Sequence, residues 1–405
     1  MLFWAVLACL LQSKSTATAY VSFSTGISPP MFSRQLPIVG GFRSMRRRRE
    51  RLRRNADRYE THPDDIRFTI MGGGSFSLAM AHVLATKGIP TTVLVRKETT
   101  ANFMNEKHSH PSYLSDMVLM DTIVATSDPT SLETATHIIH AVPVQFTREY
   151  IKKIRKHIPE STPVLSVSKG IETRSGMLMC EMLEELLGSD RSYAFLSGPS
   201  FAREIIEGKA TAVVIASNNM TLANDLSELM SSRSFRVFTS RDVIGLEVGG
   251  AVKNVIALAA GMSEGLGLGT NAMAALVTRG CVEMRRISIS LGGRASTLSG
   301  LSGVGDTFGT CFGPLSRNRN LGIRIGRGEK LKDIIRSSTE VAEGVDTAFS
   351  LEKILLKINK SYRRDLKFPI IFGVCEILKG KITPEEGLNS IMDQPLRSEV
   401  YHFDE

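Results

Sequence analysis

Residues 243–262 read VIGLEVGGAVKNVIALAAGM, and the rest of the chain is best understood from this stretch. Its strongly polar side chains are Glu247, Lys253 and Asn254, set among Val, Ile, Leu, Ala and Gly. This composition predicts a helix that is buried on nearly all of its faces. Burial disfavours the charged form of a lysine, so Lys253 either pairs with a partner or titrates closer to neutrality, as a general acid/base does.

Two other interpretations of the same stretch have to be weighed. Lys253 could extend its stem along the protein and keep its ammonium at the surface, in which case it has no chemical role. The stretch could also span a membrane, but Lys and Glu near the middle of a span are each costly in lipid. We therefore expect no membrane span in the mature protein, and other residues must decide between a buried and a surface ammonium.

The composition is that of a globular protein with room for two domains. The chain has 405 residues, of which 42% are hydrophobic and 22% charged. Its net charge of +9 is concentrated near the N-terminus, because residues 1–60 hold eleven Lys or Arg against three acids, a net of +8. The remaining body is nearly neutral, which argues against a nucleic-acid partner.

The N-terminal segment resembles a targeting leader. Residues 2–11, LFWAVLACLL, are apolar but too short to span a bilayer, and Ala17-Thr18-Ala19 suits signal cleavage, although the usual basic start is missing. Residues 20–49 contain no acid and end in arginines, which is transit-peptide composition. We therefore expect a bipartite leader over 1–63 and a plastid location, with an RNA-binding arm and a cytoplasmic or other organellar location as alternatives.

Cysteine and histidine spacing predicts neither a disulfide framework nor a metal site. The cysteines lie at positions 9, 180, 281, 311 and 375, with no CxxC pair. His137 and His140 are three residues apart in a predicted strand, where alternation sends them to opposite faces.

From Ile66 the pattern is that of a βαβ unit: a strand IRFTIM, a glycine turn, a helix from Ser75 to Lys87 and a strand TTVLV. Further strands are predicted at DTIVAT, HIIHAVP, PVLSVS, YAFLSG, TAVVIA and FRVFTS, with helices between several of them. This alternation predicts an α/β fold with a Rossmann-type, doubly wound parallel sheet over 64–241. After about Asp242 only helical spacing follows, so we expect an all-α domain over 242–405.

The glycine turn has the context that a dinucleotide requires. In GGGSFS, residues 72–77, the glycines let the backbone approach a pyrophosphate, and the following helix offers free N–H groups; Ser77 replaces the usual third glycine. A glycine turn in an α/β domain without a cofactor is the alternative. After the second strand, Arg96-Lys97 stands where an acid would select NAD, so it could bind the 2′-phosphate of NADP or stack on adenine.

Three more motifs are candidates for a shared crevice. Ser168-Lys169-Gly170 and Gly198-Pro199-Ser200 each follow a predicted strand, and ligands of open α/β sheets bind beyond the carboxyl ends of strands. Taken singly, each is more often an ordinary turn. Gly305-Asp306 and then SRNR, residues 316–319, could grip a phosphate, although SRNR alone is more often a solvated surface.

Together the motifs GGGSF, SKG, GPSFA, EVGGAVKN, GDTFGTC, SRNRNLG and VAEG, in this order, resemble the NAD(P)-dependent glycerol-3-phosphate dehydrogenases of bacterial and plastid type. The likeness runs from about Ile66 to about Asp393. It implies an enzyme that interconverts dihydroxyacetone phosphate and sn-glycerol 3-phosphate with NAD(P)H, supplying glycerol 3-phosphate for glycerolipid synthesis. It also makes a homodimer an expectation.

The resemblance implies roles for individual residues. The expected catalytic residues are Lys253, the proton donor and acceptor, with Lys169 and Asp306. The expected cofactor-binding residues are Gly72, Gly74, Ser75, Phe76, Arg96, Lys169, Ala202, Arg317, Val341 and Glu343. The expected substrate-binding residues are Lys169, Gly198, Ser200, Lys253, Asp306, Ser316, Arg317 and Asn318. Phe76 stands where many members have tryptophan, which affects cofactor affinity more than reaction type.

Lys169 and Asp306 should act in opposite directions on Lys253. A second ammonium lowers the pKa of the first by repulsion, whereas a carboxylate raises it. The alternatives to this function are a related two-domain dehydrogenase acting on a hydroxy acid, or a cofactor-binding regulator without catalysis.

Overall fold

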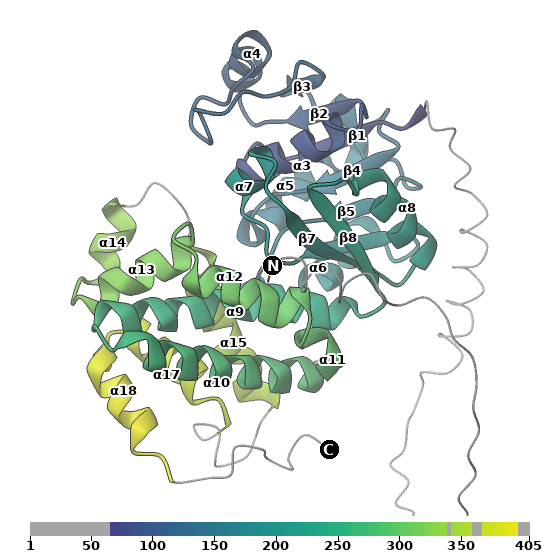
Figure 1. The fold of residues 1–405 in the computed structure, drawn as a ribbon. Helices are drawn as coiled ribbons and strands as arrows, with labels where there is room; N and C mark the ends of the chain where they lie inside the picture. Colours follow the sequence, from purple (N-terminus) through teal and green to yellow (C-terminus); the bar gives the residue numbers. More distant parts are fainter. Residues whose placement is uncertain (1–64, 338–341, 359–366, 396–405) are drawn as a thin grey trace, which may run out of the picture. The chain divides into compact units, whose positions relative to one another are not determined.

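Short apolar runs between residues 68 and 240 form one eight-stranded sheet (Figure 1). The structure is a computed structural model that describes residues 65–337, 342–358 and 367–395. In chain order the strands are β1 (Phe68–Met71), β2 (Thr91–Leu94), β3 (Ile123–Thr126), β4 (His137–His140), β5 (Val164–Ser166), β6 (Tyr193–Ser197), β7 (Thr211–Ser217) and β8 (Phe235–Ser240). Their order in the sheet is β3-β2-β1-β4-β5-β6-β7-β8.

One pair of strands departs from the predicted parallel sheet. All pairs from β3 to β6 are parallel, but β7 runs antiparallel to β6, with Ser197 opposite Val214, and β8 then runs parallel to β7. The connection from β6 to β7 contains only the five-residue helix α7 (Ala202–Ile206), which is too short to carry the chain back along the sheet for a parallel strand. The doubly wound α/β class is confirmed, with this reversal at one side.

Helices cover both faces of the sheet because successive strand residues point to opposite sides. Leu78 and Leu226 pack with Leu165 on one face, whereas Ile151 packs with Val164 on the other. The helices of this half are α3 (Ser75–Ala85), α4 (Glu98–Lys107), α5 (Val144–Ile154), α6 (Met179–Leu187), α7 and α8 (Met220–Met230), with short 3-10 turns η2 (Pro129–Leu132) and η3 (Arg155–His157).

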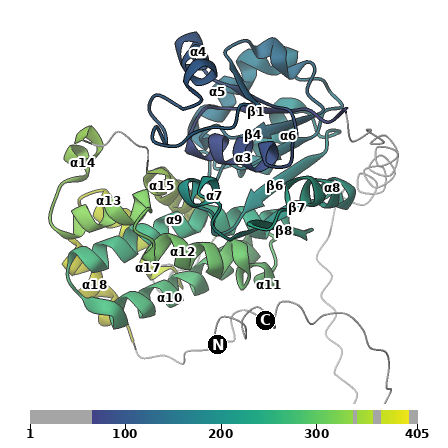
Figure 2. The same ribbon diagram turned by 45° about the horizontal axis from the view of Figure 1, so that its top comes forward.

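After β8 the described chain is helical, as predicted. Its elements are α9 (Val243–Gly265), α10 (Gly269–Ser290), α11 (Ala295–Leu298), the π-turn η4 (Leu301–Gly305), α12 (Asp306–Phe312), α13 (Arg317–Gly326), α14 (Leu331–Ser337), α15 (Glu343–Ile358), α17 (Pro369–Leu378) and α18 (Pro384–Met392). Helix α9 packs against α10, α12, α13, α15 and α17, which surround it in Figure 2. It is long and apolar enough to cross a membrane, but 94% of its apolar window is buried inside the protein. It is therefore the core helix of this half.

Helix α9 also runs along β6, in the same direction. Leu246 packs in one core cluster with Phe195, and a Cβ on Gly250 would stand 3.0 Å from the Oγ of Ser197. The chain thus passes under one face of the sheet before Lys253 is reached. The predicted leader, residues 1–63, lies outside the described residues.

Candidate active site

Lys253 lies inside the protein and its ammonium is bonded there. The residue is 8% exposed, and its Nζ donates to Asp306 Oδ1 at 2.5 Å and to Thr310 Oγ1 at 2.9 Å. Asp306 and Thr310 are four residues apart on α12, so both face α9 from one side of the same helix. The interpretation in which the lysine reaches the surface along its stem does not fit this structure.

Asp306 joins the two lysines. It is 2% exposed, and its second oxygen, Oδ2, accepts from Lys169 Nζ at 2.7 Å. Lys169 also donates to the carbonyl of Gly198 at 3.2 Å. One buried carboxylate is therefore held between two ammonium groups, one from the sheet half of the chain and one from the helical half.

The charges in this cluster set which group can exchange a proton near neutral pH. Burial lowers the pKa of Lys253 to about 8; the Asp306 charge opposes this shift and Lys169 adds to it. For Asp306, burial alone would raise the pKa, but the two neighbouring ammonium groups outweigh it and the pKa lies below its usual range. Burial and repulsion together thus outweigh the carboxylate at Lys253, while Asp306 stays ionised.

The loop that carries Lys169 is fastened to the segment after β4. Ser168 Oγ donates to the carbonyl of Val142 at 2.7 Å. The Gln145 amide donates to the Ile171 carbonyl at 2.9 Å and accepts from the N–H and hydroxyl of Thr173. These bonds hold the backbone on both sides of Lys169 in place, which keeps its ammonium within hydrogen-bonding distance of Asp306.

Gly198 closes the cluster on the sheet side. Its φ of +139° is one that side chains rarely adopt, and a Cβ would stand 2.9 Å from the Cα of Val213. Its carbonyl accepts from Lys169 and also from the Ser200 hydroxyl, at 2.8 Å. Ala202 follows as the first residue of α7. The GPSFA motif therefore contributes a carbonyl to the lysine cluster.

The glycine turn lies between β1 and α3, as its sequence context predicts. Gly72 has φ +112°, and a Cβ there would stand 2.8 Å from the Ala141 carbonyl oxygen. Gly74 is the extended N-cap of α3, and a Cβ there would meet nothing within 4 Å. The first hydrogen bond of the helix is from Leu78 N to Gly74 O, so the three preceding N–H groups have no partner in the helix. An open cradle with helix N–H groups fits a pyrophosphate.

The side chains around this turn divide into buried and exposed ones. Ser77 is 1% exposed, so a serine is accommodated where the usual motif has glycine. Phe76 packs partly against the core. Ser75 opens α3, and Arg96 is exposed directly after β2, where it can meet the adenosine end of a dinucleotide.

The predicted phosphate grip is built on the start of α13. Ser316 is the N-cap of the helix, and its Oγ accepts from Arg319 N at 3.2 Å. Asn318 Oδ1 accepts from Gly344 N at 2.9 Å. Both of these side chains are buried, whereas Arg317 is exposed. Of these three, Arg317 is placed best to meet a ligand from solvent.

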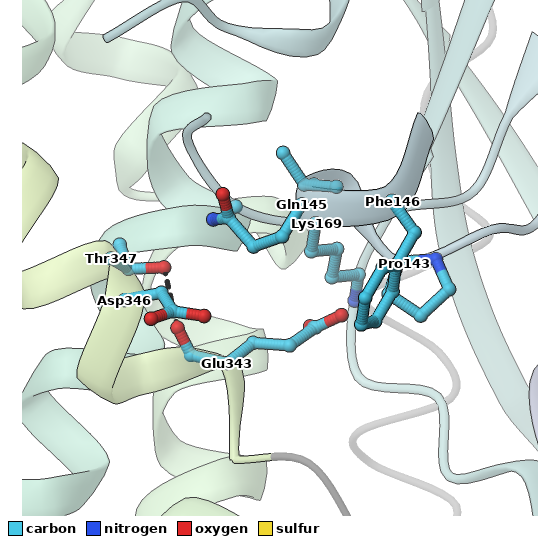
Figure 3. Close-up of a pocket in the computed structure, with 9 residues that line it drawn as sticks. Pro143, Gln145, Phe146, Lys169, Glu343, Asp346 and Thr347 are labelled. Atoms are coloured by element: carbon cyan, nitrogen blue, oxygen red, sulfur yellow. Dashed lines mark hydrogen bonds between the residues drawn. The ribbon is translucent and has the colours of Figure 1, made fainter. Parts of the chain in front are cut away.

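A pocket lies beside Lys169 (Figure 3). Glu343, the first residue of α15, points across it toward Lys169. Burial raises the pKa of Glu343, against the opposing charges of Arg317, Lys253 and Lys169. The pocket lining comprises Pro143, Val144, Gln145, Phe146, Lys169, Gly170, Glu343, Asp346 and Thr347. Val341, another predicted cofactor residue, lies outside the described residues.

Several residues of the site were not predicted. Thr310 is a second partner of the Lys253 ammonium, and its spacing of four from Asp306 is the signal that could have identified it. Gln145 and Phe146 line the pocket just after β4, where the strand-end rule already directs attention. His110 lies near the glycine turn, and no motif in the sequence indicated it.

Comparison with known proteins gives a consistent result. Family models described as the N-terminus and C-terminus of NAD-dependent glycerol-3-phosphate dehydrogenase match residues 67–223 and 242–389. A chloroplastic NAD(+) glycerol-3-phosphate dehydrogenase of Oryza sativa subsp. japonica is 40% identical over 354 residues, which cover 86% of this chain and 78% of that protein. The NAD(P)+ enzyme of Nitratidesulfovibrio vulgaris (strain DP4) is 40% identical over 336 residues, covering 82% and 100%.

A solved structure extends this likeness to the fold. The crystal structure of glycerol-3-phosphate dehydrogenase from Coxiella burnetii superposes with a TM-score of 0.77 at 33% identity, covering 82% of this chain and 100% of that one. The family models cover the sheet half and the helical half in turn, and the relatives align over both. The chain therefore belongs to the NAD(P)-dependent glycerol-3-phosphate dehydrogenase family.

Proposed function

We propose that the cluster of Lys253, Asp306 and Lys169 is the proton-transfer centre of this dehydrogenase. The reaction of the family is the interconversion of dihydroxyacetone phosphate and sn-glycerol 3-phosphate, with NAD(P)H as hydride carrier. The observation that carries the proposal is a buried carboxylate bonded to two ammonium groups, at 2.5 Å and 2.7 Å. A purely structural lysine needs no second ammonium beside its partner.

A bound nicotinamide would supply a hydride to the ketone carbon, and residues of the protein would then have to stabilise the negative charge left on the ketone oxygen. An ammonium has three N–H groups, and among the described residues Lys253 uses them toward Asp306 and Thr310, which leaves one for the ketone oxygen. That N–H stabilises the developing oxyanion, and its proton then completes the alcohol. In the reverse direction, neutral Lys253 accepts the hydroxyl proton.

The substrate phosphate would be bound at the start of α13. Arg317 is exposed there, and its guanidinium can donate two parallel hydrogen bonds to phosphate oxygens. Ser316 and Asn318 hold the helix cap and Gly344, so we propose that they shape the grip rather than supply all of its bonds. Lys169, Gly198 and Ser200 would line the opposite wall. Holding the phosphate orients the ketone toward Lys253.

The cofactor would extend from the glycine turn to the pocket beside Lys169. Gly72, Gly74, Ser75 and Phe76 form the cradle for its pyrophosphate, and Arg96 would meet the adenosine end. On the nicotinamide side we place Lys169, Ala202, Arg317, Val341 and Glu343. The open space above Gly74 supports the first part of this path. The pocket shared by Lys169 and Glu343 supports the second.

Four broader features are also proposals. They are the division into a leader (1–63), a dinucleotide-binding domain (64–241) and a substrate domain (242–405); a homodimer; a plastid location; and a role in glycerolipid supply. The chloroplastic names of the rice and Arabidopsis thaliana relatives support the plastid location. Light scattering on a sizing column tests the dimer, and imaging a fluorescent fusion of residues 1–63 tests the location.

The decisive experiment is Lys253→Met, which removes the ammonium and keeps the length of the side chain. We expect turnover of dihydroxyacetone phosphate to fall by about 10³-fold or more, while the Kd for NAD(P)H stays near that of the wild type. Nicotinamide absorbance and fluorescence measure the two quantities. Lys152→Met, on the exposed face of α5, is the matched control and should leave both unchanged. A near-wild-type rate in Lys253→Met would end the proposal.

A further inference from the structure

His110 is a buried polar residue that the catalytic cluster does not use. It lies between α4 and β3, is 5% exposed, and its ring is tilted against that of Tyr113 at 5.0 Å. Its Nδ1 accepts from the backbone N–H groups of Ser112 and Tyr113, at 3.1 and 3.0 Å. A nitrogen that accepts carries no proton, so in the neutral ring the proton is on Nε2. Burial lowers the pKa of His110, which keeps the ring neutral at physiological pH.

The Nε2–H group faces the glycine turn. Nε2 lies 3.8 Å from the point where a Cβ on Gly73 would stand, and Val95 Cγ1 lies 2.7 Å from the same point. Val95 directly precedes Arg96 at the end of β2. Within the described residues no acceptor is hydrogen-bonded to Nε2. The Nε2–H group of His110 is therefore a hydrogen-bond donor that lies where the turn after β1 meets the end of β2.

The loop holds His110 in this position by several independent contacts. Arg203 of α7 forms two hydrogen bonds with Asp116, at 2.7 and 2.9 Å, and α7 in turn packs on α3. Leu114 packs against the core of the sheet, with a left-handed φ of 50°. His108 accepts from Leu119 N at 2.6 Å, which closes the base of the loop. These contacts hold the loop on several sides, so the position of His110 relative to the glycine turn is fixed.

We infer that His110 is a cofactor-binding residue, donating its Nε2–H to an oxygen on the adenosine half of the dinucleotide. The end of β2 in a Rossmann-type sheet is where the adenosine ribose is bound, and its 2′-substituent, a hydroxyl in NADH or a phosphate in NADPH, is an acceptor. A neutral imidazole can serve either one. The inference depends on the glycine turn being the cofactor site.

The variant His110→Asn distinguishes the role of Nε2–H as a donor to the cofactor from the role of Nδ1 as the acceptor of two backbone N–H groups in the loop. The Asn Oδ1 can accept the two backbone N–H groups, as such side chains do in turns, but no group replaces Nε2–H. We expect the Kd for ADP-ribose and for NADH, from calorimetry and fluorescence, to rise about fivefold to tenfold, the worth of one neutral hydrogen bond. A larger rise with NADPH than with NADH assigns the 2′-phosphate as acceptor, and an equal rise assigns an oxygen common to both. His157→Asn, at a partly exposed ion pair with Glu133, is the control and should bind as the wild type does.

Two further measurements make the outcome decisive. Gly74→Val fills the open cradle and should abolish cofactor binding; if it does not, the site itself is misplaced, independently of His110. If Gly74→Val abolishes binding but His110→Asn binds ADP-ribose like the wild type, His110 is only a loop cap and the inference fails. On the wild-type protein, ¹⁵N-histidine NMR should show the Nε2–H tautomer and a shift of this nitrogen upon addition of ADP-ribose. An unmoved signal contradicts the inference even if the variants do not fold.

Discussion

Helix α9 contacts its neighbours in two opposite ways along its length. At Lys253 the contact with α12 is made by charged side chains, Nζ to Asp306 Oδ1. Two turns later the contact with α13 is made by backbone, since a Cβ on Gly261 would stand 2.0 Å from the Arg319 carbonyl oxygen and one on Gly322 would stand 2.2 Å from that of Leu258.

The difference shows how a buried charge can be stabilised by its partners while the surrounding helices are held in fixed positions. At the polar end of α9 the contact is made by titratable groups that lie at the ends of side chains. At Gly261 and Gly322 backbone meets backbone with no side chain between them that could readjust, so these contacts set the position of α13 relative to α9. Arg317, at the start of α13, is thereby held at a set distance from Lys253. Each of the following changes acts on one end of this arrangement.

The largest effect should come from Asp306→Asn at the polar end. It leaves the buried Lys253 and the part-buried Lys169 without their shared carboxylate, which costs about 3 kcal/mol of unfolding free energy. The pKa of Lys253 should fall further, because its favourable partner is lost, and the reduction rate at pH 7.5 should drop by about 10³-fold. Urea unfolding and nicotinamide absorbance measure these losses. Asp333→Asn, in an exposed ion pair with Arg336, is the control and should change stability by less than about 0.5 kcal/mol. Equal stability of the two variants would contradict the shared-carboxylate account.

A smaller effect is expected from Gly322→Ala at the glycine end. One methyl group must displace backbone, which costs about 3 kcal/mol or slightly less. Because α13 moves, the KM for dihydroxyacetone phosphate should rise, while the Kd for NADH stays constant. Gly373→Ala on α17, where a Cβ meets nothing within 4 Å, should instead stabilise by about 0.5–1 kcal/mol. If Gly322→Ala lowers stability but leaves KM unchanged, the glycine contact does not position the phosphate grip.

The smallest effect is that of pH on the unaltered protein. With the Lys253 pKa lowered to about 8, the proton donor is present below that pH and lost above it. The rate of ketone reduction should therefore be level near pH 7 and fall about tenfold per unit well above 8, while alcohol oxidation rises through the same range. Rates at saturating cofactor, with melting temperatures at each pH, test this. A level reduction rate from pH 7 to 9.5 would contradict the assignment of Lys253.

The sequence predicted much of the architecture because its signals are local. Alternating apolar runs gave the eight strands, and the composition of 243–262 indicated a buried helix. The reversal of β7 was not predicted, since it depends on how little helix lies between β6 and β7. Composition also could not show whether Lys169 or Asp306 dominates at Lys253, because that balance depends on distances and burial.

Other features of the site depend on contacts that only the folded chain makes, so they could not be predicted from the sequence either. The sequence did not show that Ser316 Oγ accepts from Arg319 N and Asn318 Oδ1 from Gly344 N, whereas the predicted role of both residues in substrate binding stays a prediction. His110 reads as an ordinary loop residue until the fold brings it to Gly73, which precedes it by 37 positions. The roles carried over by resemblance stay predictions until the variants are measured.

The reversed strands β7 and β8 have one more consequence. Strand β8 runs opposite to β6, so it ends on the side of the sheet where β6 begins, and α9 starts there. Helix α9 then runs alongside β6 in the same direction. Lys253 lies ten residues after the first residue of α9, a rise of about 15 Å along the helix axis. The position of the Lys253 amine is thus set by the number of helical residues between the end of β8 and Lys253. Deleting one residue between Val243 and Lys253 would turn the rest of α9, Lys253 included, by about 100° relative to the part of the helix beside β6.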